Sequence, residues 1–285
     1  QSSAASDVYK RQLYLGLIFN SLVMGAVSLA AIKFGEIVLQ IEGWQTLLIA
    51  CSVTLLYSTL GGLKAVVVTD VIQFLLAMIG SIWAAIYVIS LPQIGGINNL
   101  INHPNVIEKI SIFPDFSDPD IWVPLFFVPL AVQWWSTYYP GSEPGGGGYI
   151  AQRMFSAKNE RNAIAATFLF NFSHYALRPW PWIIIALSSL VIFPEVGDIQ
   201  NAFPGLSEDK LGDDVAYPAM LTLLPSGLLG IVSASLIAAF MSTMSTQLNL
   251  GASYLVNDFY KRFLRQDASQ KELVFAGRVF TVISI

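Results

Sequence analysis

Long apolar runs recur along the chain, and the charged residues collect in the segments between them. Six runs reach the length of about 20 apolar residues that a helix needs to cross a bilayer. They cover residues 12–32, 43–63, 71–91, 121–142, 162–194 and 215–257, and the run at 275–285 begins a further one. The runs are continuous rather than alternating, which favours helices over strands. This pattern predicts an all-α, multi-pass membrane protein with six complete spans and one partial span.

The composition supports this interpretation and narrows the function. Hydrophobic residues make up 54% of the 285 residues, charged residues only 12%, and mean hydropathy is +0.59. So few charges cannot coat a soluble globule of this size, which excludes a soluble enzyme and a disordered chain. The net charge of −4 leaves no polybasic surface for nucleic acid. A lone cysteine, Cys51, excludes a disulfide framework.

The first twelve residues, QSSAASDVYKRQ, depart from this pattern. They are polar and lack the apolar stretch of a signal peptide. We interpret 1–12 as a disordered leader that resembles translated adapter sequence, and 13–285 as the transmembrane core. The chain is therefore expected to begin and end inside a larger reading frame.

The distribution of lysine and arginine among the loops predicts how the chain is oriented in the membrane, because cytoplasmic loops are enriched in these residues. Alternating the loops places eight on one side: Lys64, Arg153, Lys158, Arg161, Lys261, Arg262, Arg265 and Lys271. Only Lys109 and Lys210 fall on the other side, with most of the acidic residues. The first side is predicted to be cytoplasmic, and the membrane to be a bacterial inner (plasma) membrane. The outer loops at about 92–120 and 194–216 are either solvated connectors or parts of an outer gate.

Small and hydroxyl-bearing residues form one helical stripe in the sixth span. Ser235, Ala239, Ser242, Thr243 and Thr246 recur at i, i+4, i+7, i+8 and i+11, and Ser245 lies beside them. Such a stripe suits close helix packing. It equally suits a small monovalent cation, which neutral hydroxyl and carbonyl oxygens can hold. The residues alone leave both alternatives open.

Three segments carry a resemblance to a known family. They are GGLKAVVVTDVIQ (61–73), YIAQRMFSAKN (149–159) and GLLGIVSASLIAAFMSTMSTQLN followed by NDFY (227–260). In this order they resemble the sodium:solute symporter family, over about 13–285. The resemblance implies a LeuT-type fold of two inverted five-helix repeats. The chain would supply core helices 3–8 and the start of 9, without core helices 1, 2 and 10.

The resemblance also implies a function. It indicates a sodium-coupled symporter that imports a small organic solute, which could be a sugar, sialic acid, amino acid or carboxylate. Na⁺ would be the coupling ion, with no organic cofactor, and the partners would be the solute and the lipid bilayer. A transporter-like solute sensor is the alternative. A multi-pass membrane enzyme is a weaker one, since no nucleophile, base or metal motif is evident.

The resemblance assigns sodium ligands residue by residue. The common sodium site would take the Ala239 carbonyl and the Ser242 and Thr243 hydroxyls. A second site would take Ser245, Thr246 and Asp70. Asp70 could also, or instead, cap the N-terminus of its helix, where a carboxylate is favourable.

Two charged positions are weaker solute candidates. Lys33 and Glu36 lie at i, i+3 and could neutralise each other, or form an interfacial pair that snorkels. Arg178, in HYALRPWPW, lies inside a predicted span and needs a partner there. It could anchor to carbonyls freed by Pro179 and Pro181, or bind an anionic solute.

The fourth span supplies the remaining candidates. Trp134, Trp135, Tyr138 and Tyr139 could stack on a sugar or form an interfacial belt. The segment YPGSEPGGGGY (139–149) disfavours a continuous helix. Since the fold resemblance makes this core helix 6, 140–148 is expected to be non-helical and to present Glu143 to the central cavity. The full set of predicted solute contacts is Glu143, Ser142, Gln133, Trp134, Arg178 and Lys33.

Overall fold

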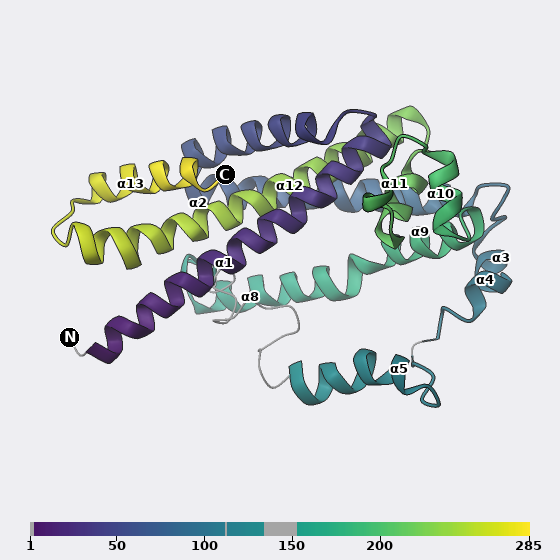
Figure 1. Ribbon diagram of the computed structural model, residues 1–285, viewed down its shortest axis with the longest axis horizontal. Helices are drawn as coiled ribbons and strands as arrows, with labels where there is room; N and C mark the ends of the chain where they lie inside the picture. The colour runs from purple at the N-terminus through teal and green to yellow at the C-terminus, as the bar shows by residue number, and fades with distance from the viewer. Residues whose placement is uncertain (1–2, 112, 134–152) are drawn as a thin grey trace. The chain divides into compact units, whose positions relative to one another are not determined.

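The computed structural model describes residues 3–111, 113–133 and 153–285, and these segments contain helices, turns and loops without a strand (Figure 1). Short π-helical and 3₁₀ segments, labelled η, interrupt or extend the α-helices. In chain order the elements are α1 (Ser3–Phe34), η1 (Gly35–Leu39), α2 (Gly43–Ile89), α3 (Ile97–Ile101), α4 (Pro104–Ile107), α5 (Pro119–Trp122), η2 (Val123–Phe127), η3 (Pro129–Gln133), α8 (Glu160–Asn171), η4 (Phe172–Leu177), α9 (Pro179–Ile192), α10 (Val196–Ala202), η5 (Glu208–Lys210), η6 (Asp213–Val215), α11 (Ala216–Leu221), α12 (Ser226–Tyr254), η7 (Leu255–Leu264) and α13 (Gln270–Ile283).

Membrane-length helices recur where the apolar runs predict them. Among the described residues, four helical stretches are long and apolar enough to cross a bilayer, namely Leu17–Leu39, Val67–Ile89, Glu160–Ile192 and Ser226–Leu264. Shorter apolar helices at Gly43–Leu56 and Pro119–Val132 fall in the two other predicted runs. The all-α, multi-pass architecture is thus confirmed, while the total of six complete spans stays a prediction. The leader boundary at residue 12 also stays a prediction; α1 begins at Ser3.

Two compact units divide the chain. One contains the described parts of 1–23, 111–164 and 247–285, and the other contains 24–110 and 165–246. The helices α1 and α12 each contribute to both units. Below, the units are called the first and the second, and each is described by itself.

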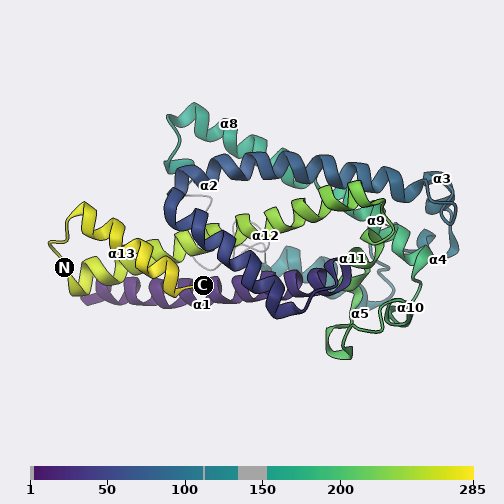
Figure 2. The same ribbon diagram turned by 90° about the horizontal axis from the view of Figure 1, so that it is seen from above.

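The core of the second unit lies where the end of α2 packs with α9, α11 and the start of α12. Val88, Ile185, Leu221 and Val232 are fully or almost fully buried there. Gly80 allows α2 to approach α12 closely, because a Cβ at this position would lie 3.3 Å from a side-chain carbon of Ile231. Figure 2 shows that α2 has two limbs joined by a sharp bend, so that one assigned helix covers two predicted spans.

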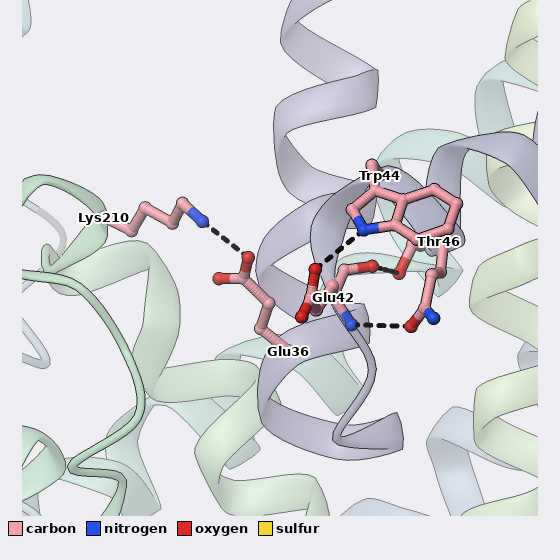
Figure 3. Close-up of polar contacts among 6 residues, drawn as sticks. Glu36, Glu42, Trp44, Thr46 and Lys210 are labelled. Carbon is pink, nitrogen blue, oxygen red and sulfur yellow. Dashed lines mark hydrogen bonds and ion pairs between the residues drawn. The ribbon is translucent and has the colours of Figure 1, made fainter.

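A tight corner joins the end of η1 to the start of α2 (Figure 3). The chain turns at Gln40, which has a left-handed φ of 54°. Glu42 caps α2 in a reciprocal capping box with Gln45, and its carboxylate accepts a 2.7 Å hydrogen bond from Trp44 Nε1. Gly35 is required here, since a Cβ would overlap the side chain of Thr46. The corner therefore fixes the entry angle of α2.

The two loops of this unit that the sequence predicts to be outer each contribute a few buried apolar side chains. In the 194–216 loop, Ile199, Leu206 and Val215 are buried together with Ile37 of η1. In the other loop, Leu100 and Val106 belong to the main core, and Asn105 Nδ2 donates to the carbonyl of Leu190 at 3.0 Å. These apolar side chains anchor the loops to the core, while most of the other described loop residues are exposed. Whether the loops are connectors or parts of an outer gate stays open.

In the first unit, α13 folds back on η7. Val256, Leu273 and Ala276 form the buried contact between them. The Tyr260 hydroxyl donates to Glu272 Oε1 at 2.8 Å, and Arg265 Nε lies 3.2 Å from the same oxygen. The Tyr260 hydroxyl, with a smaller effect of the Arg265 charge, lowers the pKa of the partly exposed Glu272 carboxyl.

Candidate functional site

The site centres on a contact between α2 and α12 within the second unit. Ser242 Oγ donates a hydrogen bond to Asp70 Oδ1 at 2.5 Å. The two residues are 172 positions apart in the sequence. At the other end of the same helix pair, Gly80 faces Ile231 and Val232, so the two helices run antiparallel with a defined register. The structure thus brings together two of the predicted sodium ligands.

The neighbouring hydroxyls of α12 make local hydrogen bonds. Thr243 Oγ1 donates to the carbonyl of Ala239 at 3.1 Å, and Ser245 Oγ donates to the carbonyl of Ser242 at 3.0 Å. Ser245 is fully buried, whereas Thr243 and Thr246 are half-buried. Ser235, one turn before Ala239, is buried and donates to Val232. The result is a set of hydroxyl and carbonyl oxygens next to one carboxylate, which is the donor set that hard monovalent cations accept.

Asp70 does not cap a helix. It lies in the interior of α2, whose assigned helix runs without a break from Gly43 to Ile89. The N-cap alternative is therefore wrong, because the backbone N–H groups near Asp70 already have partners within the helix. Its carboxylate is directed to α12 instead.

Gln73 is a further polar residue of this region, and the sequence analysis assigned no role to it. It follows Asp70 by three positions on α2, and its Oε1 atom is buried without a hydrogen-bond partner among the described residues. A polar residue one turn from Asp70, inside an otherwise apolar run, was the available signal. The position adds a further neutral oxygen to this stretch of α2.

A cavity of about 430 Å³ opens next to the hydroxyl stripe. Its walls come from α1, the first limb of α2, α11 and α12, and they are mostly apolar. Ala239 and Thr243 line it, as do Lys33, Asp214 and Tyr217. The volume lies in the range of small-molecule pockets, which are typically apolar with a few polar groups.

Lys33 and Glu36 form ion pairs, although not with each other. Lys33 Nζ lies 2.7 Å from Asp214 Oδ2, and Lys210 Nζ lies 2.5 Å from Glu36 Oε1 (Figure 3). The prediction that the two neighbours neutralise each other is wrong, because the 208–214 segment supplies an oppositely charged partner to each. These two pairs tie the end of the first span to that outer segment.

Arg178 lies at the junction of η4 and α9. Its guanidinium carbon lies 4.6 Å from the ring centroid of Trp182, which is a cation–π arrangement. Its backbone N–H donates to the carbonyl of Ser173 at 2.9 Å. The stacking on Trp182 was not predicted, and the role of Arg178 toward an anionic solute stays a prediction.

The other predicted solute contacts fall at or beyond the limit of the described segments. Gln133 is the last described residue of η3, and only its backbone is described. Trp134, Ser142 and Glu143 lie outside the described residues, as does the predicted interruption at 140–148.

The fold defines a class: an α-helical, multi-pass membrane protein, here with hydroxyl and carboxylate oxygens gathered between two of its helices. The model of the sodium:solute symporter family matches residues 13–285. The chain belongs to this family, as the three motifs indicate.

Relatives and a solved structure agree with this assignment. The chain is 28% identical to the sodium/myo-inositol cotransporter of Mus musculus over 282 residues, covering 85% of this chain and 37% of that protein. It is 28% identical to the sodium/glucose cotransporter 4 of Danio rerio, covering 88% of this chain and 40% of that protein. A Na⁺-coupled sialic acid symporter, solved in a substrate-bound outward-open state, aligns with a TM-score of 0.72 at 16% identity, over 98% of this chain and 56% of that one. This likeness confirms the LeuT-type fold. The chain thus spans well under half the length of these two curated relatives.

Proposed function

We propose that the protein to which this chain belongs is a sodium-coupled symporter that imports a small organic solute across a bacterial inner membrane. The observation that carries the proposal is the 2.5 Å contact between Ser242 and Asp70, next to the Ala239–Thr243 pair, in a member of the sodium:solute symporter family. The membrane potential would add about 2.3 kcal/mol per charge per 100 mV to the driving force.

The common sodium site would consist of the Ala239 carbonyl and the Ser242 and Thr243 hydroxyls. In the structure the Thr243 hydroxyl donates to the Ala239 carbonyl. A cation between these oxygens would replace this weak bond by ion–oxygen contacts. Rotation of the Thr243 hydroxyl proton away from the carbonyl would leave both oxygens to face the ion.

A second sodium site would involve Asp70, Ser245 and Thr246. Asp70 supplies the negative charge, and buried Ser245 lies one helical turn beyond Ser242. Because Ser242 contacts Asp70 directly, the two proposed sites would be linked through one hydroxyl. Occupation of one would then change the affinity of the other.

The solute would be a sugar, sialic acid, amino acid or carboxylate, and the named relatives favour a hydroxyl-rich member of that group. Lys33 and Arg178 remain proposed contacts, together with Gln133, Trp134, Ser142 and Glu143. Lys33 lines the cavity that also contains Ala239 and Thr243. A polar group of the solute could reach its ammonium there, beside Asp214.

Uptake by the full-length protein in proteoliposomes tests this function. A panel of labelled solutes is offered with an inward Na⁺ gradient or with choline in its place. Ser242→Ala and Thr243→Ala are each expected to raise the Na⁺ concentration for half-maximal uptake. Controls are Ser188→Ala and Thr222→Ala, whose hydroxyls, like that of Thr243, donate to a backbone carbonyl of their own helix. Equal uptake with and without Na⁺ would overturn the proposal.

A further inference from the structure

Three polar side chains of the 430 Å³ cavity gather around one ion pair of the second unit. Lys33 Nζ donates to both carboxylate oxygens of Asp214, at 3.0 and 2.7 Å. Tyr217 follows Asp214 by three positions in the helical stretch that runs from η6 into α11, so the two side chains leave the same face of that stretch. All three residues line the cavity. They are called the Lys33–Asp214–Tyr217 cluster below.

The Tyr217 hydroxyl makes no hydrogen bond within the part of the chain that the structure describes, although the residue is half-buried against the main core. A tyrosine hydroxyl that is packed into a protein usually finds a partner. Because Tyr217 lines the cavity, that partner can be a water or a solute inside it. The cluster therefore has hydrogen-bonding capacity that the described protein groups do not use.

The cluster offers donors and acceptors without a net charge. Lys33 has a third N–H group beyond the two that Asp214 accepts, the carboxylate has further lone pairs, and the Tyr217 hydroxyl can donate or accept. A solute hydroxyl matches this set, because it also donates and accepts. An anionic solute would have to displace Asp214 from Lys33 against the repulsion of that carboxylate. This displacement is costly, since the Lys33 side chain is only 12% exposed and would lose its partner.

We propose that the Lys33–Asp214–Tyr217 cluster binds the hydroxyl groups of an uncharged solute, with Asp214 and Tyr217 as specificity-determining contacts beside Lys33. The ion pair stays intact and uses its remaining hydrogen-bonding capacity. The rest of the cavity wall is mostly apolar and includes Phe34 and Phe240, which suit the carbon skeleton of the solute. The inference rests on the proposed sodium-coupled function and narrows its solutes to uncharged ones with hydroxyl groups.

The first test is Tyr217→Phe, which removes only the hydroxyl. Full-length protein in proteoliposomes is offered labelled glucose and myo-inositol as uncharged probes. We expect the probe concentration for half-maximal uptake to rise several-fold. The half-saturating Na⁺ concentration and thermal unfolding should stay unchanged, because the hydroxyl has no partner among the described residues. Tyr87→Phe is the matched control, since Tyr87 is also half-buried against the main core but does not line the cavity.

The second test is Asp214→Asn, which keeps the shape of the side chain but leaves Lys33 with an uncompensated positive charge. Labelled glucuronate serves as an anionic probe with the same ring as glucose. We expect uptake of glucuronate relative to glucose to rise several-fold in this variant. Asp213→Asn is the control, because Asp213 is an exposed neighbour that does not line the cavity, and it should leave the ratio unchanged.

The outcomes keep the inference and the proposed function apart. An unchanged half-saturation for the uncharged probes in Tyr217→Phe overturns the inference and means that the hydroxyl faces only water. An unchanged ratio of glucuronate to glucose in folded Asp214→Asn overturns it as well, and so does wild-type uptake that favours glucuronate over both uncharged probes. If Asp214→Asn does not fold, the Tyr217→Phe result decides. Equal uptake of every probe with Na⁺ and with choline overturns the proposed function instead, whatever the variants show.

Discussion

Ser242 donates its hydroxyl proton to Asp70 at 2.5 Å, and this leaves the lone pairs of the Ser242 oxygen available to another group. A hydroxyl that donates to a carboxylate becomes more electron-rich at oxygen, because charge-assisted hydrogen bonds polarise their donors. If Ser242 binds Na⁺ as proposed, Asp70 would strengthen it as a ligand, in addition to any direct contact of the Asp70 carboxylate with the ion.

Replacement of Asp70 by asparagine tests this relationship. Asp70→Asn keeps the shape and an acceptor but removes the charge. We expect the half-saturating Na⁺ concentration to rise about tenfold, which corresponds to about 1.4 kcal/mol, or one Na⁺ fewer per solute. Uptake as a function of Na⁺ and the reversal potential measure the two quantities. Asp115→Asn, on an exposed loop, is the control; an Asp70 variant that behaves like it would contradict the role of Asp70.

Gln73 offers a second test of the same stretch of α2. Its Oε1 atom is buried without a hydrogen-bond partner in the described segments. If that oxygen faces the ion, Gln73→Met should weaken Na⁺ affinity several-fold while Gln73→Glu strengthens it. If the oxygen is merely tolerated, Gln73→Met should stabilise the folded protein, because it removes an unsatisfied polar atom. Na⁺ titration and thermal unfolding together decide between the two.

Replacing either partner of the Lys33–Asp214 ion pair should lower stability, but by different amounts. The Lys33 side chain is 12% exposed, whereas that of Asp214 is 61% exposed. Asp214→Asn should cost more stability than Lys33→Met, by roughly 1–2 kcal/mol, because it leaves a largely buried ammonium unpaired while water can solvate a lone Asp214. Thermal unfolding in detergent gives the comparison. Equal losses would mean that solvent already reaches Lys33.

Gly35 should be intolerant of a side chain. Gly35→Ala places a methyl group inside the side chain of Thr46, and overpacking of this kind costs about 1–3 kcal/mol. Gly25→Ala is the matched control, because nothing lies within 4 Å of its Cβ position. Adding Thr46→Ala to Gly35→Ala should restore part of the loss in thermal unfolding. Full stability of Gly35→Ala would show that the corner yields easily.

The η7–α13 contact should weaken in acid. The pKa of Glu272 is lowered from its ordinary value of 4.5 in the folded protein, chiefly by the Tyr260 hydroxyl. A lowered carboxyl pKa contributes stability that is present above the unfolded pKa and is lost as the pH falls through the folded one. Hydrogen exchange of α13, corrected for intrinsic rates, should therefore rise more steeply below pH 4.5 in wild type than in Tyr260→Phe. Parallel pH profiles would contradict this.

The sequence predicts the parts of this site that depend on local pattern. The helical stripe through Ser242 and Thr243 follows from periodicity, and the approach of Asp70 to that stripe follows from the family resemblance. The partners of Lys33 and Glu36 could not be found in this way, because they lie on an outer segment 174 or more positions away. Short-range spacing suggested a local pair, and long-range packing of the 208–214 segment replaced it.

The buried oxygens without hydrogen-bond partners could not be predicted from the sequence for a related reason. In the sequence, Gln73, Asn20 and Gln247 are ordinary polar residues within helices. Only packing shows that their oxygens are buried without partners among the described residues. Likewise, the carboxylate of Asp70, just before the apolar run at 71–91, suggested the start of a new helix. The structure assigns one helix through both limbs of α2, so Asp70 acts through its side chain toward α12 rather than through its own backbone.

The corner at Gly35 and Thr46 also bears on how such a protein can move. Its left-handed Gln40, its capped helix start and the lack of space for a Cβ at Gly35 all restrict the backbone between η1 and the first limb of α2. We therefore expect η1 and the first limb of α2 to move together as one rigid body. If the protein alternates between outward-facing and inward-facing forms, the hinges for that motion are then expected to lie elsewhere in the chain. Any rotation of η1 would be passed on to the first limb of α2.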